Sequence, residues 1–241
     1  MKNFVSMLDN IKCENVLFLD IETVSQKKKY EELPENFKTL WDHKAQFLKK
    51  NEFETPNVVY ERAGIYAEFG KIICLSVGFF NGKQLRIKSF AGDDEYKLLE
   101  DFANLLNKSF NKAESLLCAH NGKEFDFPFI ARRMLVNGIK LPSILNIAGC
   151  KPWEVKHLDT MELWKFGDYK NYTSLELLTT IFNLETPKDD IHGNRVNDVY
   201  WNDHDLERIV TYCQKDVVAV AQLFLKYRGE DVLTNDAITF V

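Results

Sequence analysis

Short apolar runs rich in β-branched and aromatic residues alternate with polar segments in the first part of the chain. These runs predict strands at about 16–21, 72–80 and 84–90. Asn81-Gly82 separates the last two runs and is a hairpin turn signal. The sequence therefore predicts that the fold starts with three strands, of which the second and third form a hairpin.

Apolar positions three and four residues apart then predict an amphipathic helix that starts at a capping Asp93 and continues to about 110. A strand at 115–120 follows. After it, Asn121-Gly122 turns the chain into a second helix, which ends near Asn137-Gly138. Strands and helices therefore alternate through the middle of the chain.

The last third of the chain is mainly helical. Beyond a short strand at 155–159, helical periodicity is present from 174 to 184 and again from 203 to 229. Segment 26–63 is polar, and we expect it to be an insertion after the first strand with a helix around 35–50. The pattern as a whole predicts one α/β domain over 1–241, with a mixed central β-sheet flanked by α-helices.

Composition excludes several classes of protein. Of the 241 residues, 45% are hydrophobic and 28% charged, which argues against disorder and against a membrane protein. Charged residues interrupt the first 16 residues, so we expect no signal peptide, no membrane partner and a cytoplasmic location. The five cysteines form no C-x-x-C pair and are interpreted as small buried apolar residues.

The net charge of −5 bears on nucleic-acid binding. Phosphates would have to be bound by local basic clusters, because the surface as a whole is acidic. Three short runs are candidates: Lys27-Lys28-Lys29, Lys49-Lys50 and Arg132-Arg133. Runs of this length are also common on ordinary solvated faces.

Two acids end the first predicted strand, in the stretch VLFLDIETVS at 16–25. Side chains two apart on a strand share a face, so Asp20 and Glu22 would project together. Adjacent carboxylates repel each other unless one is protonated or a cation lies between them, and a divalent metal is the simplest solution. Chance is the alternative, because D-x-E also occurs at 93–95 and 205–207.

Two further acids occupy the start and the interior of predicted helices. Asp126 ends the stretch NGKEFD at 121–126, where a helix N-cap is an equally good interpretation. Tyr212 and Asp216 are four residues apart in the last helix and share a face beside its apolar stripe. A boundary tyrosine and a solvated acid are the alternative there.

The chain contains three motifs in this order: D-x-E, N-x-x-x-F-D and Y-x-x-x-D. Together they are a much more specific signal of function than any one of them. With them, the sequence resembles the DEDD superfamily of 3′–5′ exonucleases, which have a ribonuclease H-like fold. Thr211 stands where the histidine branch has its histidine, so the resemblance is to the tyrosine branch, which includes the proofreading domains of family-B DNA polymerases. It spans about 14–228 and includes the stretch AGIYAEFGKIICLSVG at 63–78.

The resemblance implies a two-metal-ion site for Mg²⁺ or Mn²⁺. Asp20 would bridge both ions, Glu22 and Asp216 would complete the site nearer the nucleophile, and Asp126 would serve the other ion. Tyr212 would orient the attacking water, since an unperturbed tyrosine pKa near ~10 makes it a poor base at neutral pH.

Substrate contacts are implied for Asn121 and Phe125, although a turn asparagine and a core phenylalanine explain these residues equally well. Asp159, at the end of the last expected strand, is interpreted as a structural acid. We expect hydrolysis from the 3′ end of single-stranded nucleic acid, DNA rather than RNA, with a role in DNA repair. An exoribonuclease and a non-catalytic nucleic-acid-binding module are the alternatives.

Overall fold

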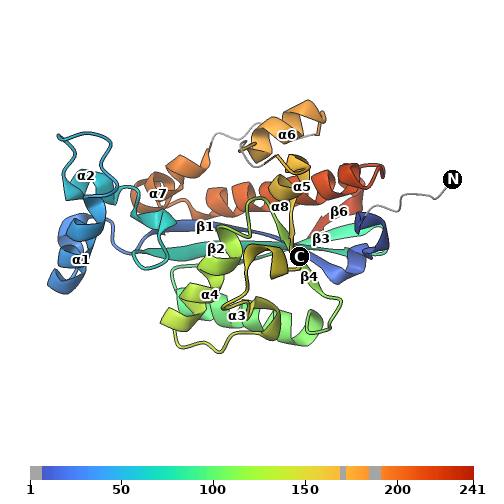
Figure 1. Cartoon of the computed structure of the whole chain (residues 1–241), viewed down its shortest axis with the longest axis horizontal. Helices are drawn as coiled ribbons and strands as arrows, with labels where there is room; N and C mark the ends of the chain where they lie inside the picture. Colours follow the sequence, from blue (N-terminus) through green and yellow to red (C-terminus); the bar gives the residue numbers. More distant parts are fainter. Residues whose placement is uncertain (1–6, 169–171, 185–190) are drawn as a thin grey trace.

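A six-stranded mixed sheet forms the centre of the computed structural model, which describes residues 7–168, 172–184 and 191–241 (Figure 1). The order of strands across the sheet is β5-β4-β1-β2-β3-β6. The strands are β1 (Val16–Ser25), β2 (Gly70–Asn81), β3 (Gln84–Ala91), β4 (Leu116–Ala119), β5 (Leu158–Asp159) and β6 (Ile238–Phe240).

Strand directions divide the sheet into two parts. β1, β2 and β3 form an antiparallel meander, as the hairpin signal predicts. On one side β4 pairs parallel with β1 and β5 parallel with β4, while at the far edge β6 pairs parallel with β3. The predicted mixed sheet is therefore confirmed, with β1 near its middle.

Helices cover both faces of this sheet. α3 and α4 lie on one face, and the 22-residue α8 crosses the other (Figure 1). No helix in the described ranges has the length and apolar character that a membrane span requires. The helices are α1 (Glu35–Ala45), α2 (Pro56–Tyr60), α3 (Glu95–Ser109), α4 (Asp126–Val136), α5 (Thr160–Lys165), α6 (Leu175–Ile181), α7 (Val196–Asp198) and α8 (Leu206–Tyr227).

The alternation of side chains along β1 decides which residues face which layer. Leu17, Leu19 and Ile21 belong to the apolar cluster under α3 and α4. Val16 and Phe18 instead pack in the cluster under α8. Continuing this period of two, residues 20 and 22 point toward α8.

The first helix boundary differs from the sequence-based expectation. The N-cap of α3 is Asp94, whose carboxylate accepts the Lys97 N–H at 3.1 Å. Asp93, which we expected to be the cap, accepts a hydrogen bond from the Tyr200 hydroxyl at 2.6 Å instead. Two adjacent aspartates fit the capping pattern equally well, and a tertiary contact determines which of them caps.

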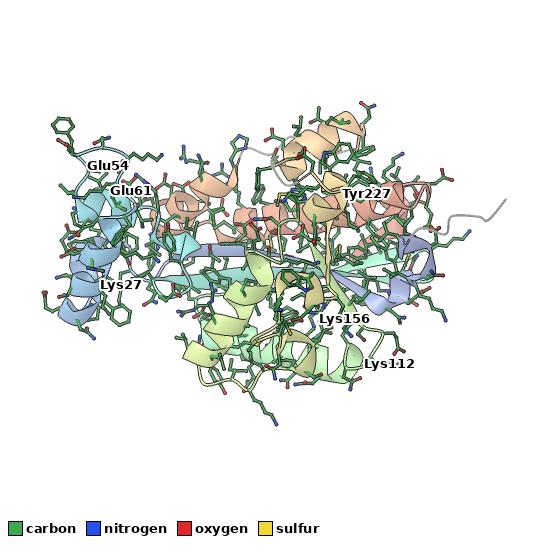
Figure 2. All side chains as sticks on the ribbon, in the orientation of Figure 1. Lys27, Glu54, Glu61, Lys112, Lys156 and Tyr227 are labelled. Atoms are coloured by element: carbon green, nitrogen blue, oxygen red, sulfur yellow. The ribbon has the colours of Figure 1, made fainter. Side chains whose placement is uncertain are left out.

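The segment between β1 and β2, predicted as an insertion at 26–63, has an apolar cluster of its own. Trp41 is fully buried in it, and its indole N–H donates to the Pro56 carbonyl at 2.8 Å. The cluster also includes Phe69, so its packing continues beyond 63 up to the start of β2. α1 and α2 lie at one end of the molecule, where Lys27 is also found (Figure 2).

One buried ion pair fastens α3 to α4. Arg133 and Glu95 are only 5% and 7% exposed, and two guanidinium nitrogens contact the carboxylate at 2.9 and 2.5 Å. The same carboxylate accepts the Ile72 N–H from β2 at 2.7 Å. Arg133 therefore takes no part in the basic surface run that the sequence suggested at 132–133.

We predict that Arg133→Ala lowers the free energy of unfolding by about 3–5 kcal/mol, because it leaves the Glu95 carboxylate buried without its cation. Urea unfolding of the purified protein measures the loss. Arg132→Ala is the matched control, since its side chain is exposed, and we expect a change within about 0.5 kcal/mol. Equal losses in the two variants would contradict the assignment.

Candidate active site

Asp20 and Glu22 meet α8 over the centre of β1. A carboxylate oxygen from each lies within 4.8 Å of the other and of the Cys213 sulfur on α8. The β1–β2 register shifts between Glu22 and Thr23, which leaves Ile73 of β2 without a partner residue. Such a bulge bends a strand and redirects its side chains, and here it lies directly beside the two acids.

α8 brings the third acid and the tyrosine to this place. Its buried residues Ile209, Cys213 and Val217 face the sheet, so Tyr212 and Asp216 lie at the edge of that contact, both half-buried. The two side chains lie close enough for the charge of Asp216 to raise the pKa of the Tyr212 hydroxyl. The Cys213 thiol contacts the Asp20 carbonyl at 3.4 Å and so connects α8 to β1 at the level of the acids.

Asp126 enters from the other face of the sheet as the first residue of α4, and it is 3% exposed. It is not the N-cap, because Phe125 occupies that position. The turn before it is held by the buried Asp159, whose carboxylate accepts the N–H groups of Asn121 at 2.9 Å and Lys123 at 3.1 Å. Asp159 thus acts through the main chain and has the structural role that the sequence suggested.

The other two predicted site residues lie on the same turn. Asn121 has a φ of +62°, and its buried side-chain oxygen has no hydrogen-bond partner among the described groups. The ring of Phe125 packs 5.4 Å from that of Phe129, at the edge of the apolar cluster. The structure places Asn121 on the turn before Asp126 with an unpartnered acceptor among the described groups, and it gives Phe125 core contacts.

Burial and mutual repulsion dominate the electrostatics of this cluster. Burial raises the pKa of Asp20 well above its usual range, and the charges of Asp216 and Asp126 raise it further. Glu22 is shifted in the same direction by burial and then by Asp20. Burial also raises the pKa of Asp126 to about 7, against opposing hydrogen bonds from its own main chain and that of Ile21.

Tyr212 responds to the same field. Burial raises the pKa of its hydroxyl, and the charges of Asp216, Glu22 and Asp20 raise it further. The phenol therefore keeps its proton at neutral pH and can act only as a hydrogen-bond donor or a neutral acceptor. The four acids and Tyr212 form one electrostatically coupled group, because each acid shifts the pKa of others in it.

A family model described as a predicted 3′-5′ exonuclease related to the exonuclease domain of PolB matches residues 65–237. That range is more than half of the chain. The chain belongs to this family. Asp126, Tyr212 and Asp216 lie within the matched range, whereas Asp20 and Glu22 precede it, so the first motif is an observation on this chain alone.

One solved structure supports the fold of this family member. The family B DNA polymerase of the hyperthermophilic archaeon Pyrobaculum calidifontis matches 87% of this chain with a TM-score of 0.52 and 16% sequence identity. The match covers 24% of the polymerase, so the chain spans about a quarter of that protein's length. At this identity the likeness establishes the α/β, ribonuclease H-like fold.

The acids of this family member fit a divalent cation. One carboxylate oxygen of Asp20 is buried and has no hydrogen-bond partner among the described atoms. Within the described ranges, neither Asp20, Glu22 nor Asp126 forms an ion pair with a basic side chain. Buried hard oxygens without a counter-charge are the donor set that Mg²⁺ and Mn²⁺ prefer.

Two contacts at the site were not expected from the sequence. The Cys213 sulfur approaches the acids instead of serving only as core filling. A Cβ built on Gly193 would lie 4.0 Å from the Tyr212 hydroxyl, so the chain before α7 passes over the tyrosine. Residues 185–190 lie outside the described residues.

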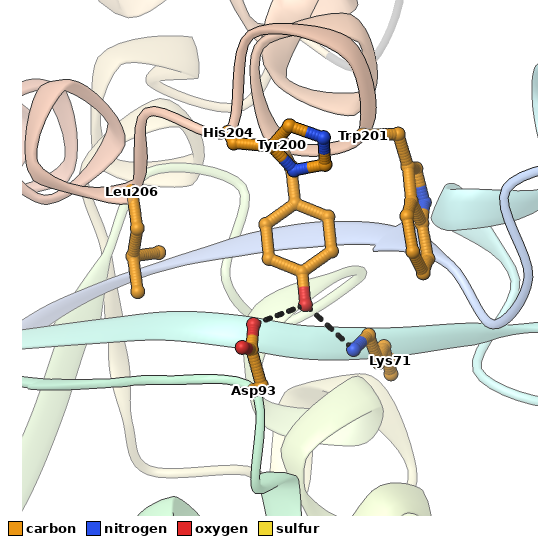
Figure 3. A pocket seen from close by; sticks show the side chains of 6 residues that line it. All are labelled: Lys71, Asp93, Tyr200, Trp201, His204 and Leu206. Atoms are coloured by element: carbon orange, nitrogen blue, oxygen red, sulfur yellow. Dashed lines mark hydrogen bonds between the residues drawn. The ribbon is translucent and has the colours of Figure 1, made fainter.

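A bridge behind the site anchors the start of α8. The Tyr200 hydroxyl donates to Asp93 and accepts from the Lys71 ammonium at 2.8 Å (Figure 3). Next to it, the Trp201 indole N–H donates to the Ser25 carbonyl at 3.3 Å. These contacts connect the π-helix Val199–Asp203 to β1 and β2. Lys71, Asp93, Tyr200 and Trp201 also line a hollow of about 470 Å³.

We predict that the metal-free protein loses stability as the pH rises from about 4 to about 7. The carboxyl of Asp126 has a pKa of about 7 in the folded state and about 3.9 when unfolded. The folded state therefore binds more protons in this window, and stability falls as the proton is lost. Thermal melts in chelator across this range measure the slope.

Asp126→Asn should flatten this dependence and raise the melting temperature near neutral pH by about 3 °C or more. Asp231→Asn, at an exposed position, is the control and should follow the wild type. If the melting temperature of the wild type stayed constant or rose with pH in this range, the raised pKa of Asp126 would be contradicted.

Proposed function

We propose that this protein is a metal-dependent 3′–5′ exonuclease of the tyrosine branch, which hydrolyses single-stranded DNA from its 3′ end. The observation on which this rests is the convergence of four acids and Tyr212, with a buried, unpartnered oxygen on Asp20. The family relationship supports the reaction class. The resemblance to a DNA polymerase favours DNA over RNA.

Four carboxylates would hold the cations: Asp20, Glu22, Asp126 and Asp216. Two divalent ions, when bound, would stabilise charge on the phosphodiester and on the departing 3′-oxygen and lower the pKa of water. The acids would attract cations because no lysine or arginine of the described chain forms an ion pair with Asp20, Glu22 or Asp126. Burial, and after it the repulsion between these acids, raises the pKa values of Asp20 and Glu22.

Tyr212 would orient the attacking water. Its hydroxyl keeps its proton, because burial and the nearby acids raise its pKa. It lies one helical turn before Asp216, a proposed cation ligand, on the same face of α8. A positioned, neutral hydroxyl of this kind can fix the direction of attack without accepting the proton.

Matched 5′-labelled DNA and RNA single strands test this proposal. We expect a ladder that shortens from the 3′ end of DNA with Mg²⁺ or Mn²⁺ and disappears with chelator. A ladder on RNA alone would show that the substrate is RNA and not DNA. Binding without any ladder would indicate a non-catalytic nucleic-acid-binding protein and refute the proposed reaction.

We predict that Asp20→Ala and Asp216→Ala each reduce hydrolysis below detection, since each removes a cation ligand. Tyr212→Phe should slow the reaction by about 10²-fold, because it removes only a positioning hydroxyl. Asp231→Ala is the control for loss of an exposed carboxylate and should leave the rate unchanged. Near-normal turnover in Asp20→Ala would refute the assignment of the cation site.

A further inference from the structure

Three consecutive lysines follow β1 in the segment 26–29, which we call the lysine loop. Lys27, Lys28 and Lys29 are all exposed. No carboxylate of the described residues forms an ion pair with their ammonium groups. The loop therefore presents a local positive charge on a chain whose net charge is −5.

The main chain of the lysine loop is held on several sides. The Gln26 N–H donates to the Phe69 carbonyl at 2.9 Å, and the Lys27 N–H donates to the Tyr60 hydroxyl at 3.3 Å. The Ser25 hydroxyl donates to the Lys27 carbonyl at 2.7 Å. The ammonium groups thus project from a fixed support, which lowers the entropy lost when they bind a ligand.

A hollow of about 540 Å³ adjoins the loop. One of its acids, Glu31, already accepts a hydrogen bond from the Asn57 amide at 2.9 Å. Lys28 and Lys29 give the hollow two ammonium groups that can contact phosphates, and the carboxylates of Glu31 and Glu61 lie beside them. The lining also includes Ser25, Asn57 and Asn197.

Two sets of residues connect this hollow to the region of the acids. Ser25 is three residues beyond Glu22 on the same strand, a distance of about 10 Å. On the other side, Asn197 accepts the Ser25 N–H at 3.0 Å, and it is four residues after Gly193, which lies over the Tyr212 hydroxyl. A strand with its 3′ end at the acids can therefore reach the loop within a few nucleotides.

Lys71 on β2 lies within electrostatic reach of the loop. Burial lowers the pKa of Lys71 on β2, and although nearby acids oppose this shift, the charge of Lys27 contributes to it. By contrast, the predicted basic run at 132–133 is reduced to one exposed arginine by the Glu95–Arg133 pair. The lysine loop is thus a basic run that lies beside the proposed active site and has free charges.

We propose that Lys27, Lys28 and Lys29 bind phosphates of the substrate strand upstream of its 3′-terminal nucleotide. This inference rests on the proposed exonuclease function and adds to it a second contact region, outside the acids. It assigns a substrate-binding role to the segment between β1 and β2. Such contacts are independent of base sequence and depend on salt.

The test compares a triple variant, Lys27→Gln with Lys28→Gln and Lys29→Gln, with the wild type. Hydrolysis of a dinucleotide and of a DNA strand of about 15 nucleotides is measured. Anisotropy in Ca²⁺ gives the affinity of a labelled strand of the same length as a function of salt. The control removes three exposed lysines elsewhere, by Lys108→Gln with Lys112→Gln and Lys140→Gln; Lys112 lies far from Lys27 in Figure 2.

We expect the lysine-loop variant to raise KM for the long strand about tenfold and to reduce the advantage of the long strand over the dinucleotide. The slope of log affinity against log salt should fall by about 2, because each single-strand phosphate contact contributes about 0.7. The control variant should keep the wild-type slope.

Equal behaviour of the two triple variants, with the wild type active, would overturn the inference and leave the proposed function standing. A wild type that hydrolyses neither substrate would refute the proposed function, and the inference with it. Near-ultraviolet circular dichroism checks that both variants keep the wild-type fold.

Discussion

The rest of the structure has to accommodate the repulsion between the carboxylates that lie on β1 under helix α8. Asp20 and Glu22 stand on a central strand of the sheet, and burial raises their pKa values, with repulsion from neighbouring acids in the same direction. Such an arrangement costs free energy in the metal-free protein. The surrounding structure has to supply that free energy, and a divalent cation would return part of it on binding.

Asp20 and Glu22 differ from two other buried acids, Glu95 and Asp159, in their hydrogen-bond and ion-pair partners. Glu95 is buried to a similar degree, but Arg133 and a main-chain N–H satisfy it. Asp159 is buried and accepts main-chain N–H groups. These two structural acids are thus neutralised or hydrogen-bonded, whereas Asp20 keeps a buried oxygen without a partner among the described atoms. That contrast is the physical argument that the cluster serves a ligand.

The local placement of the candidate site residues could be predicted from sequence, because the geometry of a strand and of a helix determines it. A period of two places Asp20 beside Glu22, and a helical turn places Tyr212 beside Asp216. Contacts between distant parts of the chain could not be predicted, among them the Ser25–Asn197 hydrogen bond across 172 residues. The three-residue β6 and five-residue α2 were also missed, since such short elements carry no periodicity and depend on tertiary contacts.

Calorimetric titration with Mn²⁺ tests whether these acids form a site for divalent cations. Wild-type protein, Asp20→Asn and the exposed control Asp231→Asn would be titrated near neutral pH. We expect the wild type and the control to bind two ions saturably and to release protons, and we expect Asp20→Asn to lose at least one of the two ions. Identical titrations of all three proteins, or no saturable binding by the wild type, would contradict the assignment of a cation site to these acids.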